Sequence, residues 1–221
     1  MPELSQRALE VHQRLLAAFG EPTWRNPLSA VDELVSTILS QNTNDVNRDR
    51  AFDALCAKFP TWEQVRDAQA EAVIAAIRPA GLANQKGPRI QQVLRAITEE
   101  RGNLDLSFLA DLPVDEARAW LTKFNGVGPK TAAIVLCFSL GRPAFPVDTH
   151  IYRVSGRIGL RPERMTVEQA HPHLEALFPP ETYYAAHLNL IRLGREVCGA
   201  RKPLCGKCPI RDLCDFEPKT K

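Results

Sequence analysis

The chain has 221 residues, of which 44% are hydrophobic and 24% are charged, and its formal net charge is +2 at neutral pH. This composition is typical of a folded globular protein and excludes a disordered chain. No run of about 18 apolar residues is present, and residues 1–20 lack the apolar core and cleavage site of a secretory signal. We therefore expect neither a membrane span nor secretion.

Apolar residues recur at helical spacing along almost the whole chain. The first three helices are expected around the apolar sets Leu4, Ala8, Val11 and Leu15; Val31, Leu34, Val35, Ile38 and Leu39; and Ala51, Leu55 and Phe59. Further helices are expected at about 70–77, 84–100, 114–122, 129–140, 149–159, 166–177 and 182–196. Proline or glycine interrupts the pattern between segments, and no set of alternating strands is present. The sequence therefore predicts an all-α fold of about ten short helices.

A glycine-rich turn at residues 124–128, FNGVG, separates the helices expected at 114–122 and 129–140. Glycine adopts backbone angles that other residues avoid and lets another chain approach closely. Pro129 suits the first position of the second helix, where its missing N–H costs nothing. The free N–H groups of such a turn attract anions, so the turn is either a clamp for DNA phosphates or only a tight connection. The residues that would form the clamp are Gly126, Val127 and Gly128.

Lys130 lies in the first turn of the helix that follows, where a helix disfavours positive charge. If water is also excluded, its pKa is expected to be lowered, and the neutral amine could attack an electrophilic carbon such as C1′ of a sugar. A lysine that swings out to bind phosphate or water is an equally good interpretation. Asp148, 18 residues later, precedes another helix. It could cap that helix, stabilise an oxocarbenium-like sugar or take the lysine's proton.

The C-terminal segment CGARKPLCGKCPIRDLC contains four cysteines with the spacing C-x6-C-x2-C-x5-C, namely Cys198, Cys205, Cys208 and Cys214. Nothing indicates secretion, so disulfides are not expected. Structural zinc sites usually pair two short knuckles, whereas this segment has one, and its wider spacing modestly favours an iron–sulfur cluster over zinc. Cys56 and Cys137 lie in apolar helical segments and are interpreted as buried small hydrophobes.

Residues 192–207 carry a local excess of positive charge, with five Lys and Arg residues against the single Glu196. Such a stretch suits contact with phosphate backbones, although charge alone slightly favours a solvated basic face. Arg201 and Lys202 lie between the first two cysteines of the C-terminal segment. A cluster bound by those cysteines would present both residues to a phosphate.

Three motifs in this order resemble the endonuclease III family of helix-hairpin-helix DNA glycosylases. They are LTKFNGVGPKTAAIVL, VDTHIYRVSGR and CGARKPLCGKCPIRDLC, and the upstream stretches STILSQNTNDVNRDRAF and IRPAGLANQKGPRIQQV match as well. The resemblance covers roughly residues 25–216. Many DNA-binding proteins contain the hairpin, but the ordered combination of Lys130, Asp148 and the four cysteines is specific to this family.

The resemblance implies an enzyme that removes oxidised pyrimidines from duplex DNA and then nicks the abasic strand by β-elimination. Lys130 would be the Schiff-base nucleophile and Asp148 the catalytic carboxylate, and the four cysteines would bind a [4Fe–4S] cluster. Gln41 would fill the gap left by the flipped base, and Leu82 would push into the opposite strand.

The resemblance also implies two all-α domains. Residues 25–134 would carry the hairpin, and residues 1–24 together with 135–221 would form a discontinuous iron–sulfur cluster domain. We expect a monomer that binds double-stranded DNA containing damaged bases or abasic sites. The length and the lack of targeting extensions indicate a cytoplasmic, nucleoid-associated protein of a bacterium or archaeon.

The sequence departs from the family pattern at two places. The stretch SQNT differs from the alanine and threonine that commonly follow the glutamine in bacterial relatives, so Asn42 and Asn44 leave the gap filling and the opposite-base preference open. Pro129 stands where arginine or lysine is frequent, which removes one possible phosphate contact. Neither departure affects Lys130 or Asp148.

Three other functions compete with this interpretation. An adenine glycosylase of the same superfamily usually lacks the lysine, has an acid in the segment matching 36–41 and needs an additional domain, whereas that segment here reads STILSQ. A thymine-mismatch glycosylase also tends to replace the lysine. The presence of both Lys130 and Asp148 argues against a non-catalytic DNA-binding module held together by a metal.

Overall fold

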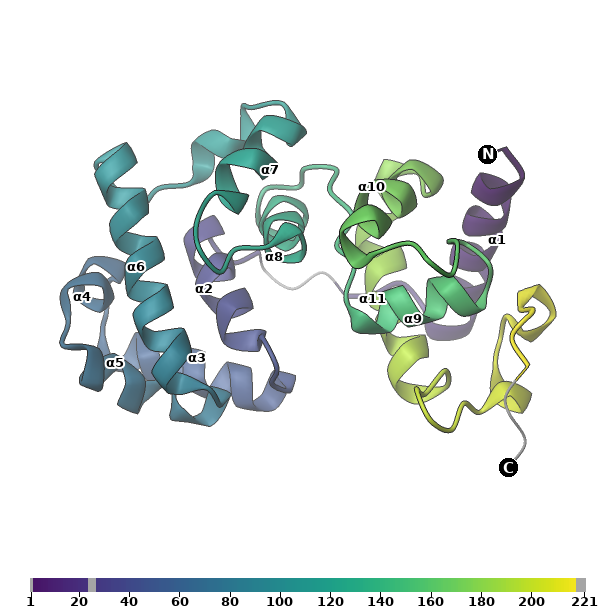
Figure 1. The fold of residues 1–221 in the computed structure, drawn as a ribbon, viewed down its shortest axis with the longest axis horizontal. Coiled ribbons are helices and arrows are strands. Elements are labelled where there is room, and N and C mark those ends of the chain that lie inside the picture. Colours follow the sequence, from purple (N-terminus) through teal and green to yellow (C-terminus); the bar gives the residue numbers. More distant parts are fainter. Residues whose placement is uncertain (1, 24–26, 218–221) are drawn as a thin grey trace. The chain divides into compact units, whose positions relative to one another are not determined.

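The computed structural model describes residues 2–23 and 27–217. These residues form α-helices, short 3-10 turns and a π-turn, with no strand among them, which confirms the expected all-α fold (Figure 1). None of the described helices has the length and apolar character needed to cross a bilayer. The chain divides into two compact units, which we call the hairpin unit (residues 27–142) and the terminal unit (residues 1–26 together with 143–221).

The hairpin unit is built around α2. Its helices are α2 (Ala30–Ser40), α3 (Asp45–Lys58), α4 (Trp62–Asp67), α5 (Ala70–Ala76), α6 (Ala83–Arg101), α7 (Val114–Thr122) and α8 (Pro129–Ile134). Shorter turns are the 3-10 turns Arg78–Ala80 and Ser107–Ala110 and the π-turn Val135–Ser139. Helix α2 packs against α3, α6 and α8, and most of its side chains are buried. The apolar residues of α2 lie on one side, and the small Ser36 and Thr37 on the other side are buried as well, so the other helices enclose most of α2.

The terminal unit combines the N-terminal helix with the C-terminal part of the chain. Its helices are α1 (Pro2–Phe19), α9 (Thr149–Arg157), α10 (Val167–Leu177) and α11 (Tyr183–Glu196), and its 3-10 turns are Pro180–Thr182, Cys205–Lys207 and Arg211–Leu213. Helix α11 packs against both α1 and α9. Phe145 stacks on Phe178 with 5.1 Å between ring centroids and meets Tyr183 edge-on at 5.3 Å. This aromatic cluster forms part of the core of the unit.

Two buried histidines fix the segment 143–148, which leads into α9. Nδ1 of His187 lies 2.9 Å from the carbonyl oxygen of Pro146, and Nδ1 of His171 lies 3.3 Å from the carbonyl oxygen of Phe145. A carbonyl oxygen can only accept, so each histidine carries a proton on Nδ1. Since the histidines belong to α10 and α11, these two helices determine where α9 begins.

The structure differs from the sequence prediction at two places. The prediction misses α4, because its six residues are too few to show helical periodicity, and only the cap at Thr61 marks its start. The prediction also gives one continuous helix at 129–140, whereas the helix widens into a π-turn after Ile134. That π-turn packs against α2, so residues 135–142 belong to the hairpin unit and not to the domain in which they are expected.

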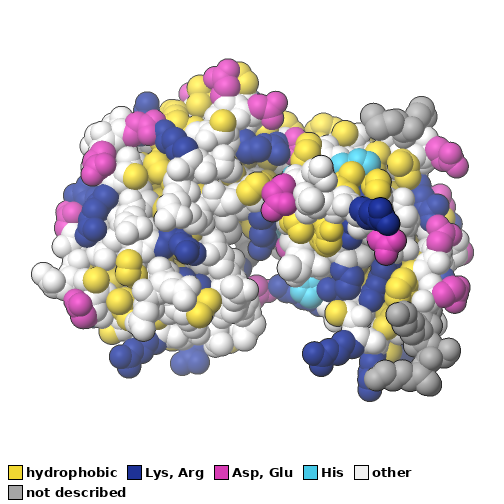
Figure 2. All heavy atoms as spheres, viewed as in Figure 1, with side chains coloured by type: hydrophobic (Ala, Val, Ile, Leu, Met, Phe, Trp, Pro, Cys, Tyr) yellow, Lys and Arg dark blue, Asp and Glu magenta, His cyan; other side chains and the backbone are white. Residues whose placement is uncertain are grey.

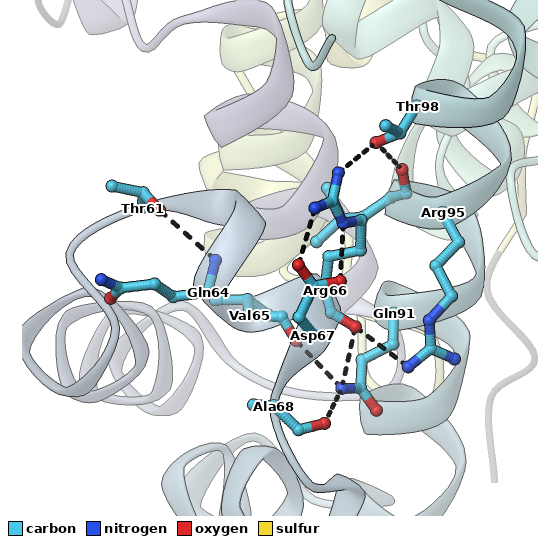
Figure 3. Close-up of polar contacts among 10 residues, drawn as sticks. Thr61, Gln64, Val65, Arg66, Asp67, Ala68, Gln91, Arg95 and Thr98 are labelled. Carbon is cyan, nitrogen blue, oxygen red and sulfur yellow. Dashed lines mark hydrogen bonds and ion pairs between the residues drawn. The ribbon is translucent and has the colours of Figure 1, made fainter. Parts of the chain in front are cut away.

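Polar contacts attach α4 to α6 (Figure 3). The buried Gln91 donates from Nε2 to three carbonyl oxygens at the end of α4: Val65 at 2.9 Å, Arg66 at 3.4 Å and Ala68 at 2.8 Å. Arg95, one turn further along α6, donates to the same oxygen of Arg66 at 2.9 Å. The last carbonyl oxygens of a helix lack partners within it, so Gln91 serves as a C-terminal cap supplied by another helix.

Replacing Gln91 with leucine is expected to lower the free energy of unfolding by about 2–3 kcal/mol, because a side chain of similar size leaves these buried oxygens without that donor. Chemical denaturation followed by circular dichroism measures the loss. Gln92→Leu is the matched control, since Gln92 is exposed on the same helix, and it should change the free energy by less than about 0.5 kcal/mol. Equal losses in the two variants would contradict this role for Gln91.

Candidate active site

Gly126 shapes the turn between α7 and α8. Its φ of +88° lies in the left-handed region, which favours glycine. Val127 is buried, and its N–H donates to the carbonyl oxygen of Phe124 at 3.0 Å, so this residue anchors the turn to the hairpin unit. Gly128 and Pro129 begin α8, and a Cβ at Gly128 would meet no atom within 4 Å. The backbone at Gly128 is therefore open to the approach of another chain.

The two candidate catalytic residues each lie at the start of a helix. Lys130 is half-buried at the second position of α8, in the hairpin unit. Asp148 is half-buried at the start of α9, in the terminal unit, and its Oδ1 accepts the N–H of Ile151 at 2.7 Å. This bond confirms the predicted capping role of Asp148, and it engages one of the two carboxylate oxygens.

The two candidate gap-filling residues belong to the hairpin unit. Gln41 ends α2, and its Nε2 donates to the carbonyl oxygen of Gly126 at 3.1 Å, so it lies against the hairpin turn. Leu82 precedes α6 with φ 50° and ψ 31°, in the left-handed region, and is 47% exposed. A leucine in this region is strained, and strained backbone is concentrated at functional positions. The structure thus holds a large apolar side chain in solvent on a constrained backbone.

The asparagines that depart from the family pattern shape the loop after Gln41. Asn42 has a φ of +53°, and asparagine is one of the few residues that tolerate this conformation. Asn44 caps α3, and its Oδ1 accepts the N–H of Asn47 at 2.8 Å. Neither role is predicted above from the sequence, although asparagine in a short loop before a helix is a recognisable signal for each.

A buried lysine joins the loops that carry Gln41 and Leu82. Lys86 is 1% exposed, and its Nζ donates to the carbonyl oxygens of Leu39 at 2.8 Å and Ala80 at 2.7 Å. Each oxygen lies at the end of a helical segment, where partial negative charge favours a cation. Burial nevertheless lowers the pKa of Lys86 from its ordinary value. Lys86 is not among the residues predicted from the sequence, although a lysine on the buried face of an expected helix is a detectable signal.

The cysteine loop, residues 198–214, contains four half-buried cysteines, and the structure shows no disulfide among these four. Burial raises the pKa of the Cys208 thiol, and so do the other three cysteines of the loop, which lie near it. The backbone N–H of Ile210 bonds to the Cys208 sulfur and acts in the opposite direction. Within the described residues, no three His, Cys, Asp or Glu side chains converge closely enough to hold a single metal ion. Of the other two cysteines, Cys137 is buried and Cys56 is half-buried.

Arg157, at the end of α9, holds the first part of the cysteine loop. Its Nη1 donates to the carbonyl oxygen of Gly199 at 2.8 Å and lies 3.3 Å from the sulfur of Cys198. Arg201 and Lys202, which follow, are exposed. N–H donors directed at sulfur stabilise thiolates, so the donor set of the loop suits an iron–sulfur cluster.

Part of the basic stretch, residues 192–207, is engaged within the terminal unit. Arg192 pairs with Glu196 at 3.1 Å, and its guanidinium stacks over Phe19 of α1 at 4.6 Å. Acidic and basic side chains both occur on the visible face of each unit (Figure 2). The exposed Arg201 and Lys202 are therefore better candidates for a phosphate contact than the stretch as a whole.

Comparisons with protein families match most of the chain. Residues 35–180 match the model of the HhH-GPD superfamily base excision DNA repair proteins, and residues 198–214 match the iron–sulfur binding domain of endonuclease III. Endonuclease III of Escherichia coli K12 is 35% identical over 96% of this chain and 97% of its own length. A protein of Arabidopsis thaliana named as a DNA glycosylase is 37% identical over 79% of this chain. The match spans only 59% of the length of that protein.

Solved structures show the same fold. A trapped endonuclease III–DNA covalent intermediate superimposes with a TM-score of 0.82 at 28% identity and covers 96% of this chain and 95% of that one. A non-covalent endonuclease III–DNA complex gives a TM-score of 0.81 with the same identity and coverage. A thermostable thymine-DNA glycosylase, at 22% identity, shares the fold with a TM-score of 0.80.

Lys86→Met is expected to lower the free energy of unfolding by about 2–4 kcal/mol at neutral pH, because the carbonyl oxygens of Leu39 and Ala80 both lose a buried donor. Denaturant titration measures the loss. Lys58→Met is the matched control, since Lys58 is exposed and donates to the carbonyl oxygen of Ala72 at 3.1 Å. It should cost less than about 0.5 kcal/mol.

The pH dependence of the free energy of unfolding, compared between wild type and Lys86→Met, gives a second measurement. The pKa of Lys86 is lowered in the folded chain and is about 10.4 in the unfolded chain, so the unfolded chain binds more protons between the two values. The stability advantage of wild type over Lys86→Met should therefore grow as pH rises through that interval. An advantage that shrinks would show that the ammonium form is favoured by folding.

Proposed function

The chain belongs to the endonuclease III family of HhH-GPD base excision DNA repair glycosylases, and we propose that it removes oxidised pyrimidines from duplex DNA and then cleaves the abasic strand by β-elimination. We further propose that it acts as a monomer on duplexes that contain a damaged base or an abasic site. The observation that carries the proposal is the position of Lys130. It is the second residue of α8 and directly follows the turn whose backbone is accessible at Gly128.

The proposed reaction begins by taking the target nucleotide out of the base stack, because an amine cannot reach C1′ of a stacked nucleotide. Nζ of Lys130 then attacks C1′, and the bond from C1′ to the damaged base breaks with its electron pair on the base, which takes up a proton. The nitrogen then loses a proton, and its lone pair forms the double bond of an imine with C1′ while the C1′–O4′ bond breaks with its electron pair on O4′, which takes up a proton as the sugar ring opens. The imine acidifies the C2′ proton, and loss of that proton expels the 3′ phosphate.

Asp148 is proposed to stabilise the positive charge that develops on the sugar and to help deprotonate Lys130. The N–H of Ile151 occupies Oδ1 of Asp148, which leaves Oδ2 to act. His171 and His187 fix the backbone of the segment that ends at Asp148. A carboxylate held in this way loses little freedom when it meets the charged sugar.

The proposed DNA contacts come from both units. The turn at Gly126, Val127 and Gly128 would bind a phosphate through backbone N–H groups, and the exposed Arg201 and Lys202 would bind another. Gln41 would occupy the space of the flipped base, and Leu82 would enter the opposite strand. The exposed, backbone-constrained Leu82 resembles the apolar wedges with which proteins unstack DNA.

The family match assigns a [4Fe–4S] cluster to this protein, and we propose that its ligands are the thiolates of Cys198, Cys205, Cys208 and Cys214. When bound, the cluster supplies a covalent cross-link among these positions. Arg157 orients the loop between the first two cysteines by bonding the carbonyl oxygen of Gly199. The same loop carries the cations proposed to bind phosphate.

Borohydride reduction of a mixture with an abasic duplex should trap wild type as a covalent protein–DNA adduct. Lys130→Ala should reduce the adduct by about 100-fold or more, because no amine remains to form the imine. Denaturing gel electrophoresis measures the adduct. Lys123→Ala is the matched control, because Lys123 lies before the same hairpin turn and pairs with Glu100, and it should leave trapping intact. The lyase proposal fails if wild type gives no adduct.

The substrate proposal is tested separately. Duplexes that each carry one defined lesion should lose an oxidised pyrimidine to wild type faster than mismatched adenine or thymine. Removal of mismatched thymine or adenine without removal of any oxidised pyrimidine would show that the glycosylase acts on mismatches.

Cys208→Ser should lower the iron content of the purified protein well below the roughly four atoms per chain expected for wild type, because one cluster ligand is lost. Metal analysis by mass spectrometry gives the ratio. Cys56→Ser, which lies outside the cysteine loop, should keep the wild-type ratio. Stoichiometric zinc without iron in wild type would overturn the assignment of the ligands to an iron–sulfur cluster.

A further inference from the structure

The side chain of Gln41 is held at both ends of its carboxamide. Nη1 of Arg89 donates to Oε1 of Gln41 at 3.1 Å, and Nε2 of Gln41 donates to the carbonyl oxygen of Gly126 at 3.1 Å. The three residues come from three elements, namely α6, the end of α2 and the hairpin turn. Nothing in the proposed function assigns a role to Arg89.

Chemistry fixes the orientation of the Gln41 amide between these partners. A guanidinium has only donors, and a carbonyl oxygen only accepts. The amide oxygen must therefore face Arg89, and the amide nitrogen must face Gly126. A flipped amide would place two donors together and two acceptors together, so only one orientation is compatible with both contacts.

Arg89 also covers the hairpin turn itself. A Cβ added to Gly126 would lie 2.1 Å from Cδ and 2.5 Å from Nε of Arg89, so the arginine stem occupies the space that any side chain would need. Gly126 is thus required twice, once for its φ of +88° and once for the contact with Arg89.

One face of α6 brings these contacts to the residues proposed to enter DNA. Leu82, Lys86 and Arg89 stand at positions i, i+4 and i+7, which lie on one side of a helix. Lys86 bonds the carbonyl oxygen of Leu39, two residues before Gln41, while Arg89 bonds the Gln41 side chain. The first turns of α6 therefore hold both the backbone at Leu39, near Gln41, and the side chain of Gln41 itself.

We propose that Arg89 is a positioning residue that orders the Gln41 side chain for entry into the gap left by a flipped base and joins it to the hairpin turn. This inference rests on the proposed function of Gln41. A long flexible side chain loses rotamer freedom when it enters a duplex, and a side chain that is already ordered avoids most of that cost. Because the same arginine covers Gly126, the turn and the gap-filling side chain are positioned together.

The test compares equilibrium binding to two duplexes, one undamaged and one carrying a tetrahydrofuran abasic analogue that cannot react. Arg89→Met keeps the apolar stem and removes the donors. It should lower the preference for the abasic duplex by about tenfold, the size expected for one charge-assisted hydrogen bond. If Arg89 only contacted phosphate, both affinities would fall together and the preference would not change, which would overturn the inference.

Two further variants sharpen the result. Arg95→Met removes the same charge from the same helix but touches neither Gln41 nor Gly126, and it should leave the preference within about twofold of wild type. Arg89→Met combined with Gln41→Ala should show the same preference as Gln41→Ala alone, because Arg89 acts through Gln41. Additive losses would show an independent role and overturn the inference.

Separate measurements distinguish a loss of preference for the abasic duplex from misfolding and from a failure of the proposed lyase reaction. Thermal unfolding reports whether Arg89→Met is folded. If it is not, Arg89→Gln replaces it in the binding test. Arg89→Gln keeps a shorter donor and should show the same loss of preference for the abasic duplex. Wild type without any preference for the abasic duplex would refute the inference together with the role of Gln41. Borohydride trapping on abasic DNA still decides the lyase proposal in that case, since it depends on Lys130.

Discussion

Short helices leave many backbone carbonyl oxygens without partners, and the supply of donors to these oxygens is the constraint on which the rest of the structure depends. The protein meets it with long side chains from neighbouring helices. Gln91 reaches the end of α4, Lys86 reaches the end of α2, and His187 reaches the segment before α9. Each donor satisfies a backbone group and also fixes the spacing of two elements, so polar contacts act together with the apolar core in setting the arrangement within each unit.

The candidate functional residues lie at the same kind of position. Gln41 ends α2, Leu82 precedes α6, Lys130 opens α8 and Asp148 opens α9. At a helix end the side chain can leave the bundle, while the adjoining turn of helix supplies a rigid support. The donors that complete the helix ends therefore lie next to the residues proposed to handle DNA. Stability and the proposed chemistry share these contacts, since the buried Lys86 bonds the carbonyl oxygens of Leu39 and Ala80, each two residues before a candidate gap-filling residue.

Local rules predicted much of this from the sequence, and long-range pairing accounts for what they missed. Apolar spacing predicted the described α-helices other than α4, and capping chemistry predicted that Asp148 begins α9. The contact between Lys86 and Leu39 joins residues 47 positions apart, and that between Arg89 and Gln41 joins residues 48 apart, so no local pattern encodes either. The π-turn after α8 depends on packing against α2 and has no sequence signal of its own. Roles carried over from the family resemblance, such as that of Lys130, stay proposals.

The contact between Arg89 and Gly126 has a consequence for the modularity of the hairpin. Many DNA-binding proteins contain a helix-hairpin-helix, and the motif could be taken for a part that transfers between scaffolds as a unit. Here the turn packs at Gly126 against the side chain of Arg89, which lies 37 residues earlier, on a helix outside the hairpin. A graft of α7, the turn and α8 alone would lack the Arg89 side chain that packs against Gly126, and a side chain added at position 126 would clash with Arg89. The smallest transferable part of this protein therefore includes the first turns of α6.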